Sequence, residues 1–194
     1  MLTRFVPAFI CALLLIVVIA ASTNAQTAEA SRPRSVAEAS LRLKGVDGKV
    51  YDVAEMRGEV VMVSFGATWC VPCASELAAI EELKEEFKSK PVKFLWVSIE
   101  SGSEASNALL RHYARTHRLS VPVLRDPDKA AFAQFSDRVR IPLVVFFDRQ
   151  GKFAAPAHRG MSSEPIEYKN NMRRRLQALL ASDAAVTTTS ATMR

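Results

Sequence analysis

The chain has 194 residues, of which 49% are hydrophobic and 24% charged, and its formal net charge is +6. That length fits one folded domain with a sizeable core. The basic excess is modest and no basic-aromatic stripe accompanies it, so the sequence does not favour nucleic-acid binding. We expect Arg173, Arg174 and Arg175 to form a solvated helix face near a helix C-terminus, where positive charge suits the helix dipole.

The first 25 residues have the order of a secretory signal. A short basic start with Arg4 precedes an apolar run over 5–21, and small residues follow up to Ala25. The run of about 17 residues is at the lower limit for a membrane span, so an uncleaved N-terminal anchor is the competing interpretation. We therefore predict a signal peptide or membrane anchor over 1–25 and a periplasmic or otherwise extracytoplasmic protein, secreted or anchored.

Beyond a spacer over 26–35, strand and helix patterns alternate. Asp47-Gly48 predicts a tight turn between two short strands, and apolar spacing predicts the elements that follow. These are strands over 60–65, 92–99, 121–124 and 141–147, helices over 73–88, 104–117, 126–135 and 163–180, and a hairpin through Gln150-Gly151 to Phe153. The expected inward-facing residues of the helices over 104–117 and 163–180 are Leu109, Leu110, Tyr113, Ile166, Met172, Leu176, Leu179 and Leu180. This order predicts a three-layer α/β domain over 36–181 and a disordered tail over 182–194.

Cys70 and Cys73 form a C-x-x-C pair between the strand over 60–65 and the predicted helix. At a helix N-terminus both sulfurs lie within one turn, and the helix dipole stabilises a thiolate. A thiolate attacks a disulfide, and a second thiol nearby resolves the mixed disulfide. Cys11 lies in the predicted signal, so export leaves one dithiol in the mature chain. A bridge closing so short a loop stabilises little, which favours a redox function over a structural disulfide.

The same cysteine spacing could also supply half of a zinc site. A structural zinc site normally needs four Cys or His ligands. The chain has no second C-x-x-C, and His112, His117 and His158 show no paired ligand spacing. We expect neither a metal nor another cofactor.

Residues 65–76, F-G-A-T-W-C-V-P-C-A-S-E, resemble the signature F-W-A-T-W-C-x-P-C-x-x-E of thioredoxin-like proteins of the TlpA/ResA type. The resemblance extends over roughly 36–180. It implies a thioredoxin-like three-layer α/β fold, in which helices flank a central mixed sheet, with an added N-terminal β-hairpin and one inserted helix. Two positions depart from the family pattern: Gly66 replaces the usual tryptophan, and Arg140 replaces the glycine often found before Ile-Pro. Both are expected to alter the surface that binds a partner.

The resemblance also implies a role for each residue of the site. Cys70 would be the exposed nucleophile and Cys73 the deeper resolving thiol of a redox-active disulfide. Pro142 would be cis and would place the Ile141 backbone beside the disulfide, to pair with a substrate strand. The substrate-binding residues would be Trp69, Pro72, Ile141 and Pro142. From the residues alone, Pro142 could simply begin a strand and Trp69 could simply pack.

Glu76 follows Cys73 by one helical turn. In TlpA/ResA-like proteins a glutamate there assists thiol proton transfer, which would make Glu76 a third catalytic residue. Ordinary thioredoxins use a buried aspartate six residues before the first cysteine, where this chain has Ser64. A carboxylate near two sulfurs should raise the thiol pKa values by repulsion. The alternative is a solvent-facing helix acid like Glu81 and Glu82.

The predicted function is therefore that of an extracytoplasmic thiol–disulfide oxidoreductase, a reductant of the kind used in cytochrome c or copper-oxidase assembly. The expected partners are a protein disulfide substrate and an upstream thiol donor protein, and we expect a monomer with a possible N-terminal membrane association. A peroxidase is disfavoured because peroxiredoxins carry T-x-x-C, and here Ala67 takes the threonine position. A Sco-like copper chaperone has C-x-x-x-C and a histidine before the strand that Leu143 begins, whereas His158 lies beyond it. A non-catalytic binding protein is the remaining alternative.

Overall fold

The computed structural model describes the backbone of residues 39–192 and the side chains of residues 39–182. These residues belong to a compact unit that spans Ser35–Arg194. The predicted signal over 1–25 and the spacer over 26–35 lie outside the described residues. Within the described part, no helix has both the length and the apolar character needed to cross a membrane.

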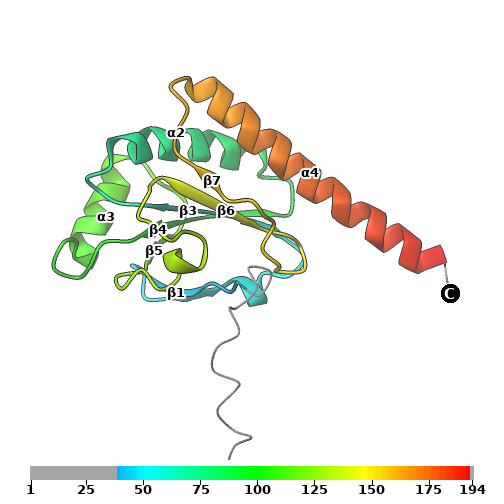
Figure 1. The fold of residues 1–194 in the computed structure, drawn as a ribbon, viewed down its shortest axis with the longest axis horizontal. Coiled ribbons are helices and arrows are strands. Elements are labelled where there is room, and N and C mark those ends of the chain that lie inside the picture. Colours follow the sequence, from blue (N-terminus) through cyan, green and yellow to red (C-terminus); the bar gives the residue numbers. More distant parts are fainter. Residues whose placement is uncertain (1–38, 193–194) are drawn as a thin grey trace, which may run out of the picture. The chain divides into compact units, whose positions relative to one another are not determined.

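Seven strands form one mixed sheet: β1 (Arg42–Gly45), β2 (Val50–Asp52), β3 (Val60–Gly66), β4 (Val92–Ser98), β5 (Val123–Arg125), β6 (Leu143–Phe147) and β7 (His158–Arg159). Their order across the sheet is β2-β1-β5-β4-β3-β6-β7 (Figure 1). The central strands β3, β4 and β5 are parallel, and β6 is antiparallel to β3. The hairpin of β1 and β2 extends the edge at β5, and β7 extends the edge at β6.

Both faces of the sheet are covered, which is why β3 and β6 are apolar without alternation. Three helices pack on one face: α2 (Val71–Glu86), α3 (Asn107–Thr116) and α4 (Pro165–Thr192). The other face is covered by the chain before β1 and by two short 3-10 helices, η2 (Val53–Glu55) and η3 (Phe132–Gln134). The mixed sheet, its helices and the leading hairpin agree with the predicted fold.

Two local predictions were wrong. Only the 3-10 turn η3 forms in the helix predicted over 126–135, because Lys129 has a left-handed φ of 58°. The Asp126 carboxylate instead accepts the N–H groups of Ala131 and Phe132, at 3.1 and 2.8 Å. After the Gln150-Gly151 turn, Phe153 makes only an isolated bridge to Phe147, and the strand that pairs with β6 is β7.

Helix α4 differs most from its prediction. Ile166 was expected to face inward but is 57% exposed, whereas Tyr168 is fully buried in its place. Tyr168, Met172 and Leu176 repeat at intervals of four residues and form the buried stripe. In α3, Leu109 is likewise exposed rather than inward-facing. The helix also continues to Thr192, where a disordered tail was predicted over 182–194; the alanines there are strong helix formers.

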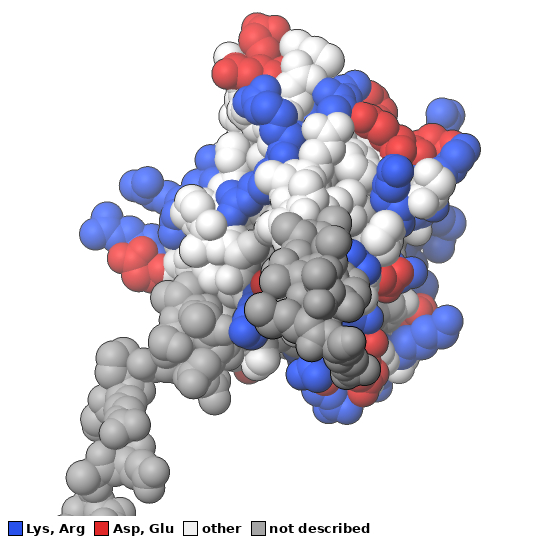
Figure 2. Space-filling view, turned by 90° about the vertical axis from the view of Figure 1, so that its right-hand side faces the viewer, with Lys and Arg blue, Asp and Glu red and all other residues white. Residues whose placement is uncertain are grey.

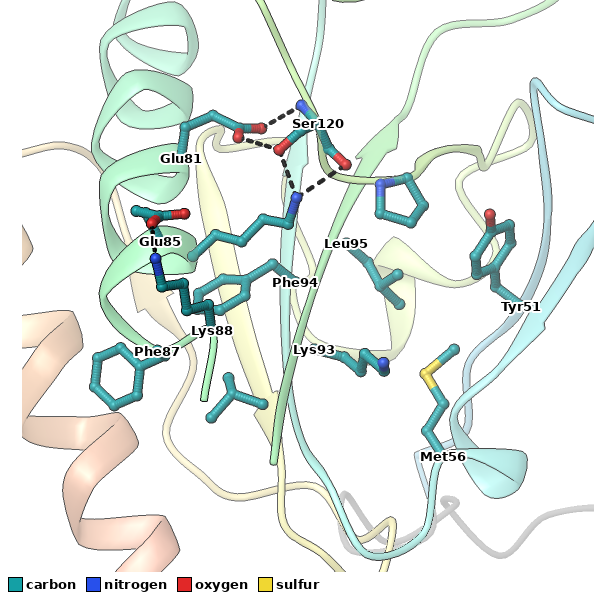
Figure 3. A pocket seen from close by; sticks show the side chains of 13 residues that line it. Tyr51, Met56, Glu81, Glu85, Phe87, Lys88, Lys93, Phe94, Leu95 and Ser120 are labelled. Carbon is teal, nitrogen blue, oxygen red and sulfur yellow. Dashed lines mark hydrogen bonds and ion pairs between the residues drawn. The ribbon is translucent and has the colours of Figure 1, made fainter. Parts of the chain in front are cut away.

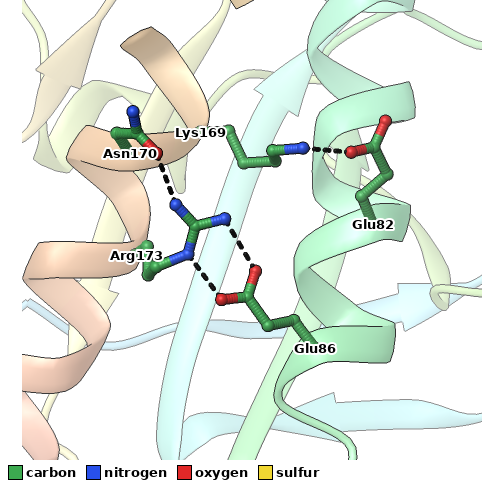
Figure 4. Close-up of polar contacts among 5 residues, drawn as sticks. All are labelled: Glu82, Glu86, Lys169, Asn170 and Arg173. Carbon is green, nitrogen blue, oxygen red and sulfur yellow. Dashed lines mark hydrogen bonds and ion pairs between the residues drawn. The ribbon is translucent and has the colours of Figure 1, made fainter. Parts of the chain in front are cut away.

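Charged side chains join α4 to α2 (Figure 4). Lys169 pairs with Glu82, and the guanidinium of Arg173 forks onto both carboxylate oxygens of Glu86. The guanidinium of Arg175 lies 4.7 Å from the ring centre of Phe146 and donates to a backbone carbonyl. Of the three arginines only Arg174 is exposed as predicted, and the expected position near a helix C-terminus was wrong, because α4 continues to Thr192.

The basic excess is not gathered into one patch on the face shown in Figure 2. Lys and Arg side chains stand around the rim of this face with Asp and Glu side chains among them.

Candidate active site

Cys70 and Cys73 are joined by a disulfide at the start of α2, with their Cα atoms 5.2 Å apart. Cys70 is the N-cap of the helix, and its Sγ accepts the N–H of Cys73 at 3.3 Å. Pro72 lies in the first turn, where its missing N–H costs no helical hydrogen bond. The local sequence thus places both sulfurs at the positive end of the α2 dipole.

The two cysteines differ little in exposure. Cys73 is fully buried and Cys70 is 5% exposed. Cys70 is thus the more exposed of the two, as predicted. The prediction that Cys70 is exposed was wrong for the oxidised protein. Ala67 and Ile141 pack around the disulfide and cover it. The exposed side chains are instead those on either side of Cys70: Trp69 at 61% and Val71 at 79%.

The loop before β6 lies against the disulfide. Its Ile141–Pro142 peptide bond is cis, and the Ile141 side chain contacts the cluster that contains both cysteines. The Pro142 carbonyl accepts the N–H of Gly160 at 2.9 Å, which ties this loop to the chain after β7. The structure therefore brings the cysteine pair, Ile141 and Pro142 together at one end of the sheet.

Glu76 is fully buried and does not face solvent. Its two carboxylate oxygens accept one hydrogen bond each, from the Ser64 hydroxyl at 2.5 Å and from the Tyr168 hydroxyl at 2.8 Å. Burial raises the pKa of Glu76 to about 7, although the two hydrogen bonds act in the opposite direction. A carboxyl group with this pKa can take up and release a proton near neutral pH.

Tyr168 is the site residue that the sequence analysis missed. It lies on α4, 92 residues from Glu76, and no motif links the two positions. The four-residue spacing of Tyr168, Met172 and Leu176 was the available signal, but it indicates burial and not a partner. Burial and the neighbouring Glu76 keep the pKa of Tyr168 well above its ordinary value, so this hydroxyl remains a hydrogen-bond donor.

The structure gives a steric reason for Gly66 in place of the usual tryptophan. A Cβ at position 66 would stand 2.9 Å from Trp96 Nε1 and 3.2 Å from Cys73 Sγ. Trp96 lies on β4 directly beside Ser64, and it is fully buried. Its indole therefore fills the space next to Gly66. The Nε1–H of Trp96 has no hydrogen-bond partner among the residues that the structure describes.

A second buried carboxylate holds the loop that leads to Cys70. Glu100 accepts hydrogen bonds from the N–H and the hydroxyl of Thr68, at 2.9 and 2.6 Å, and from the Ser98 hydroxyl at 2.9 Å. Glu100 is 2% exposed. It thereby fixes the backbone immediately before Trp69.

A hollow of about 600 Å³ lies elsewhere, along the C-terminal half of α2 and the start of β4 (Figure 3). Its polar groups bind one another: the Glu81 carboxylate accepts from the backbone N–H and hydroxyl of Ser120, and the Lys84 ammonium donates to the same residue. None of the predicted site residues lines it. In the described part of the chain, no cluster of three or more His, Cys, Asp or Glu could hold a metal ion.

A C-x-x-C disulfide at a helix start, beside a cis-proline loop on a mixed sheet, defines a redox protein of the thioredoxin fold. The chain belongs to the Redoxin family, whose model matches residues 16–168. It is 34% identical to the thioredoxin-like protein YneN of Bacillus subtilis over 84 residues, which are 43% of this chain and about half (48%) of YneN.

Two further similarities agree with this family. The chain is 23% identical to the thiol-disulfide oxidoreductase ResA of Bacillus subtilis over 129 residues, covering 66% of this chain and 69% of ResA. The exposed lipoprotein thioredoxin Etrx1 of Streptococcus pneumoniae superposes with a TM-score of 0.58 and 28% identity over 72% of this chain and 99% of its own. The predicted resemblance, fold class and enzyme class are confirmed: the chain has the family, fold and disulfide of a thiol–disulfide oxidoreductase.

Proposed function

We propose that this protein reduces disulfides of partner proteins outside the cytoplasm by exchange at Cys70. The observation that carries the proposal is the helix N-terminal Cys70–Cys73 disulfide one turn from the buried Glu76, whose pKa is about 7. The proposal also states that the protein acts as a reductant and takes part in cytochrome c or copper-oxidase assembly. Both points come from the resemblance to the TlpA/ResA type.

The exchange balances in two steps. In the reduced protein the Cys70 thiolate attacks one sulfur of the substrate disulfide, forms a mixed disulfide and releases the first substrate thiolate, which takes up a proton. Cys73 then gives its proton to Glu76 and attacks Cys70 Sγ. This restores the Cys70–Cys73 bond and releases the second substrate thiolate, which takes up a proton, while Glu76 gives up the proton that it received. Two electrons pass to the substrate, and an upstream thiol donor protein resupplies them.

Each neighbour of the disulfide has a task in this scheme. The helix dipole favours the Cys70 thiolate, and Glu76 supplies a base one turn from Cys73. Ile141 packs against the disulfide, and the resemblance to the TlpA/ResA type assigns its backbone to pair with an extended substrate strand there. Trp69 and Pro72 are exposed next to Cys70 in the chain, and the resemblance assigns them to substrate binding.

The copper-chaperone alternative gains no support from the position of His158. This side chain lies on β7, and its ring packs edge-on against Tyr168 with centroids 5.5 Å apart. It therefore takes part in the packing of α4 and does not join a group of metal ligands with the cysteines.

The first test is the reduction of insulin together with the reduction potential of the dithiol. We expect the reduced protein to accelerate insulin reduction, and its potential to lie closer to that of thioredoxin, about −270 mV, than to that of DsbA, about −120 mV. The potential is measured by equilibration with glutathione buffers. A potential near the DsbA value would reverse the proposed direction, and a protein inert towards insulin would favour the non-catalytic alternative.

The second test concerns location. If Ala25 is the cleavage point, the mature protein begins at Gln26 and fractionates with soluble extracytoplasmic proteins. The pneumococcal relative described as an exposed lipoprotein supports a location outside the cytoplasm. N-terminal sequencing of the exported protein, with fractionation, checks this expectation. Membrane-bound material that retains residues 1–25 would establish the anchor interpretation.

A further inference from the structure

Three arginines surround the loop that reaches the disulfide. Arg138, Arg140 and Arg159, together with Ser136 and Asp137, line a surface hollow of about 210 Å³. All three arginines are exposed. We call Arg138, Arg140 and Arg159 the arginine surface. Arg140 immediately precedes Ile141, so this surface begins one residue from the side chain that contacts the cysteines.

Backbone contacts hold the arginine surface in place. Arg159 pairs with Leu143 across β6 and β7, and its guanidinium donates to the Phe135 carbonyl at 3.1 Å. The Ser136 hydroxyl donates to the Arg138 carbonyl at 2.8 Å. Two separate segments, 136–140 and β7, thus bring their positive charges to the same end of β6.

The positive charge of this surface is poorly compensated. Asp137 is the single acid of the lining, and its carboxylate lies 3.9 Å from Arg138 in a pair whose side chains are both more than three-quarters exposed. An ion pair this exposed contributes little to stability. The first turn of α2 carries no acid, and the site carboxylates Glu76 and Glu100 are buried and hydrogen-bonded from within. The lining thus carries three exposed arginines against one exposed acid, so the charge that it presents to a partner is positive.

We propose that the arginine surface selects partner proteins whose reactive disulfide is flanked by acidic residues. This inference rests on the proposed exchange at Cys70 and adds the chemical class of its substrate. Guanidinium groups pair with carboxylates through charge-assisted hydrogen bonds, and complementary charge raises the rate of encounter. Val139, between Arg138 and Arg140, and Trp69 and Val71, on either side of Cys70, are exposed apolar side chains that can add contact area.

The test compares peptides that contain one disulfide and differ only in its neighbours: two Glu, two Ser or two Lys. With the reduced full-length protein at low salt, we expect the second-order rate of reduction to be about tenfold higher for the Glu peptide than for the Lys peptide. High salt should remove most of this difference. Arg138→Gln/Arg140→Gln should bring the ratio of the two rates close to one.

A matched double variant controls for the loss of two charges. Arg115 and Arg174 are exposed and lie on α3 and α4, outside the arginine surface. Arg115→Gln/Arg174→Gln should keep the preference for the Glu peptide. Equal rates for all three peptides in the wild type, or the same loss of preference in the control variant, would overturn the proposal.

Binding separates this inference from the proposed function. The affinity of the oxidised protein for the reduced, alkylated peptides is measured through the fluorescence of the exposed Trp69, without any exchange. If no peptide is reduced, the proposed function fails. The comparison of the affinities for the Glu and Lys peptides still tests whether the arginine surface recognises acidic partners. Tighter binding of the Glu peptide that Arg138→Gln/Arg140→Gln abolishes supports it, and equal binding refutes it.

Discussion

Replacing Cys73 by serine is expected to trap covalent complexes between Cys70 and partner proteins, whereas Cys70→Ser should trap none and lose disulfide reduction completely. Cys70 is the N-cap residue and the more exposed of the two, at 5% against 0%, so it is the thiol that we expect a substrate disulfide to reach. Without the Cys73 thiol, the mixed disulfide has no internal resolving group. Non-reducing electrophoresis of exported proteins, followed by mass spectrometry, measures the trapped fraction.

The double variant Cys70→Ser/Cys73→Ser is the control and should form no complexes. Because Cys70 is only 5% exposed in the oxidised protein, we expect its alkylation after reduction to be slower than that of a surface cysteine, yet faster than that of Cys73. Complexes that form only with Cys70→Ser, or equal alkylation rates for the two thiols, would contradict the assignment.

The second large effect is expected from Glu76→Gln, which removes the charge and keeps the shape. Above pH 7 the Glu76 carboxylate is ionised, so it repels the thiolates and raises their pKa values. The variant should shift the pH dependence of thiol alkylation down by about one unit, equivalent to roughly 1.4 kcal/mol. Disulfide reduction near neutral pH should fall at the same time, because the base for Cys73 is gone.

The same group should make the stability of the oxidised protein depend on pH. Burial raises the pKa of Glu76 from an ordinary 4.5 to about 7, so the folded state holds this proton more tightly than the unfolded state. Below pH 4.5 Glu76 should therefore not change the free energy of unfolding. Between pH 4.5 and 7 the free energy of unfolding should fall, and above pH 7 it should be lower than at pH 4.5 by on the order of 3 kcal/mol. Glu76→Gln should lack this decrease in denaturant titrations at pH 4.5 and pH 8.

Two variants sharpen this experiment. Tyr168→Phe removes a hydrogen bond that lowers the pKa of Glu76, so the decrease in stability should still begin near pH 4.5 but extend to higher pH. Glu85→Gln, on an exposed part of the same helix, should keep the wild-type profile. If Glu76→Gln and Glu85→Gln share both the alkylation and the stability profiles of the wild type, Glu76 has no part in proton transfer.

The sequence by itself determined the features that depend on neighbouring residues. The C-x-x-C pair between a continuous apolar strand and a helical pattern is local, and so is the Pro72 that suits a first turn. Burial on both faces forces apolar residues at successive positions of β3 and β6, so these strands were also predictable. Residues 65–76 carried the resemblance from which the fold and the enzyme class followed.

Only the tertiary structure decided what surrounds the disulfide. Glu76 is hydrogen-bonded to Tyr168 on α4 and to Ser64 on β3. The periodicity of residues along α2 cannot predict either of these neighbours. The glycine at position 66 is explained only by the neighbouring side chain of Trp96 on β4. Arg159 joins Arg138 and Arg140 only through the pairing of β7 with β6. Local patterns indicate which residues avoid water, whereas a pKa or a charged surface depends on which distant elements pack against each other.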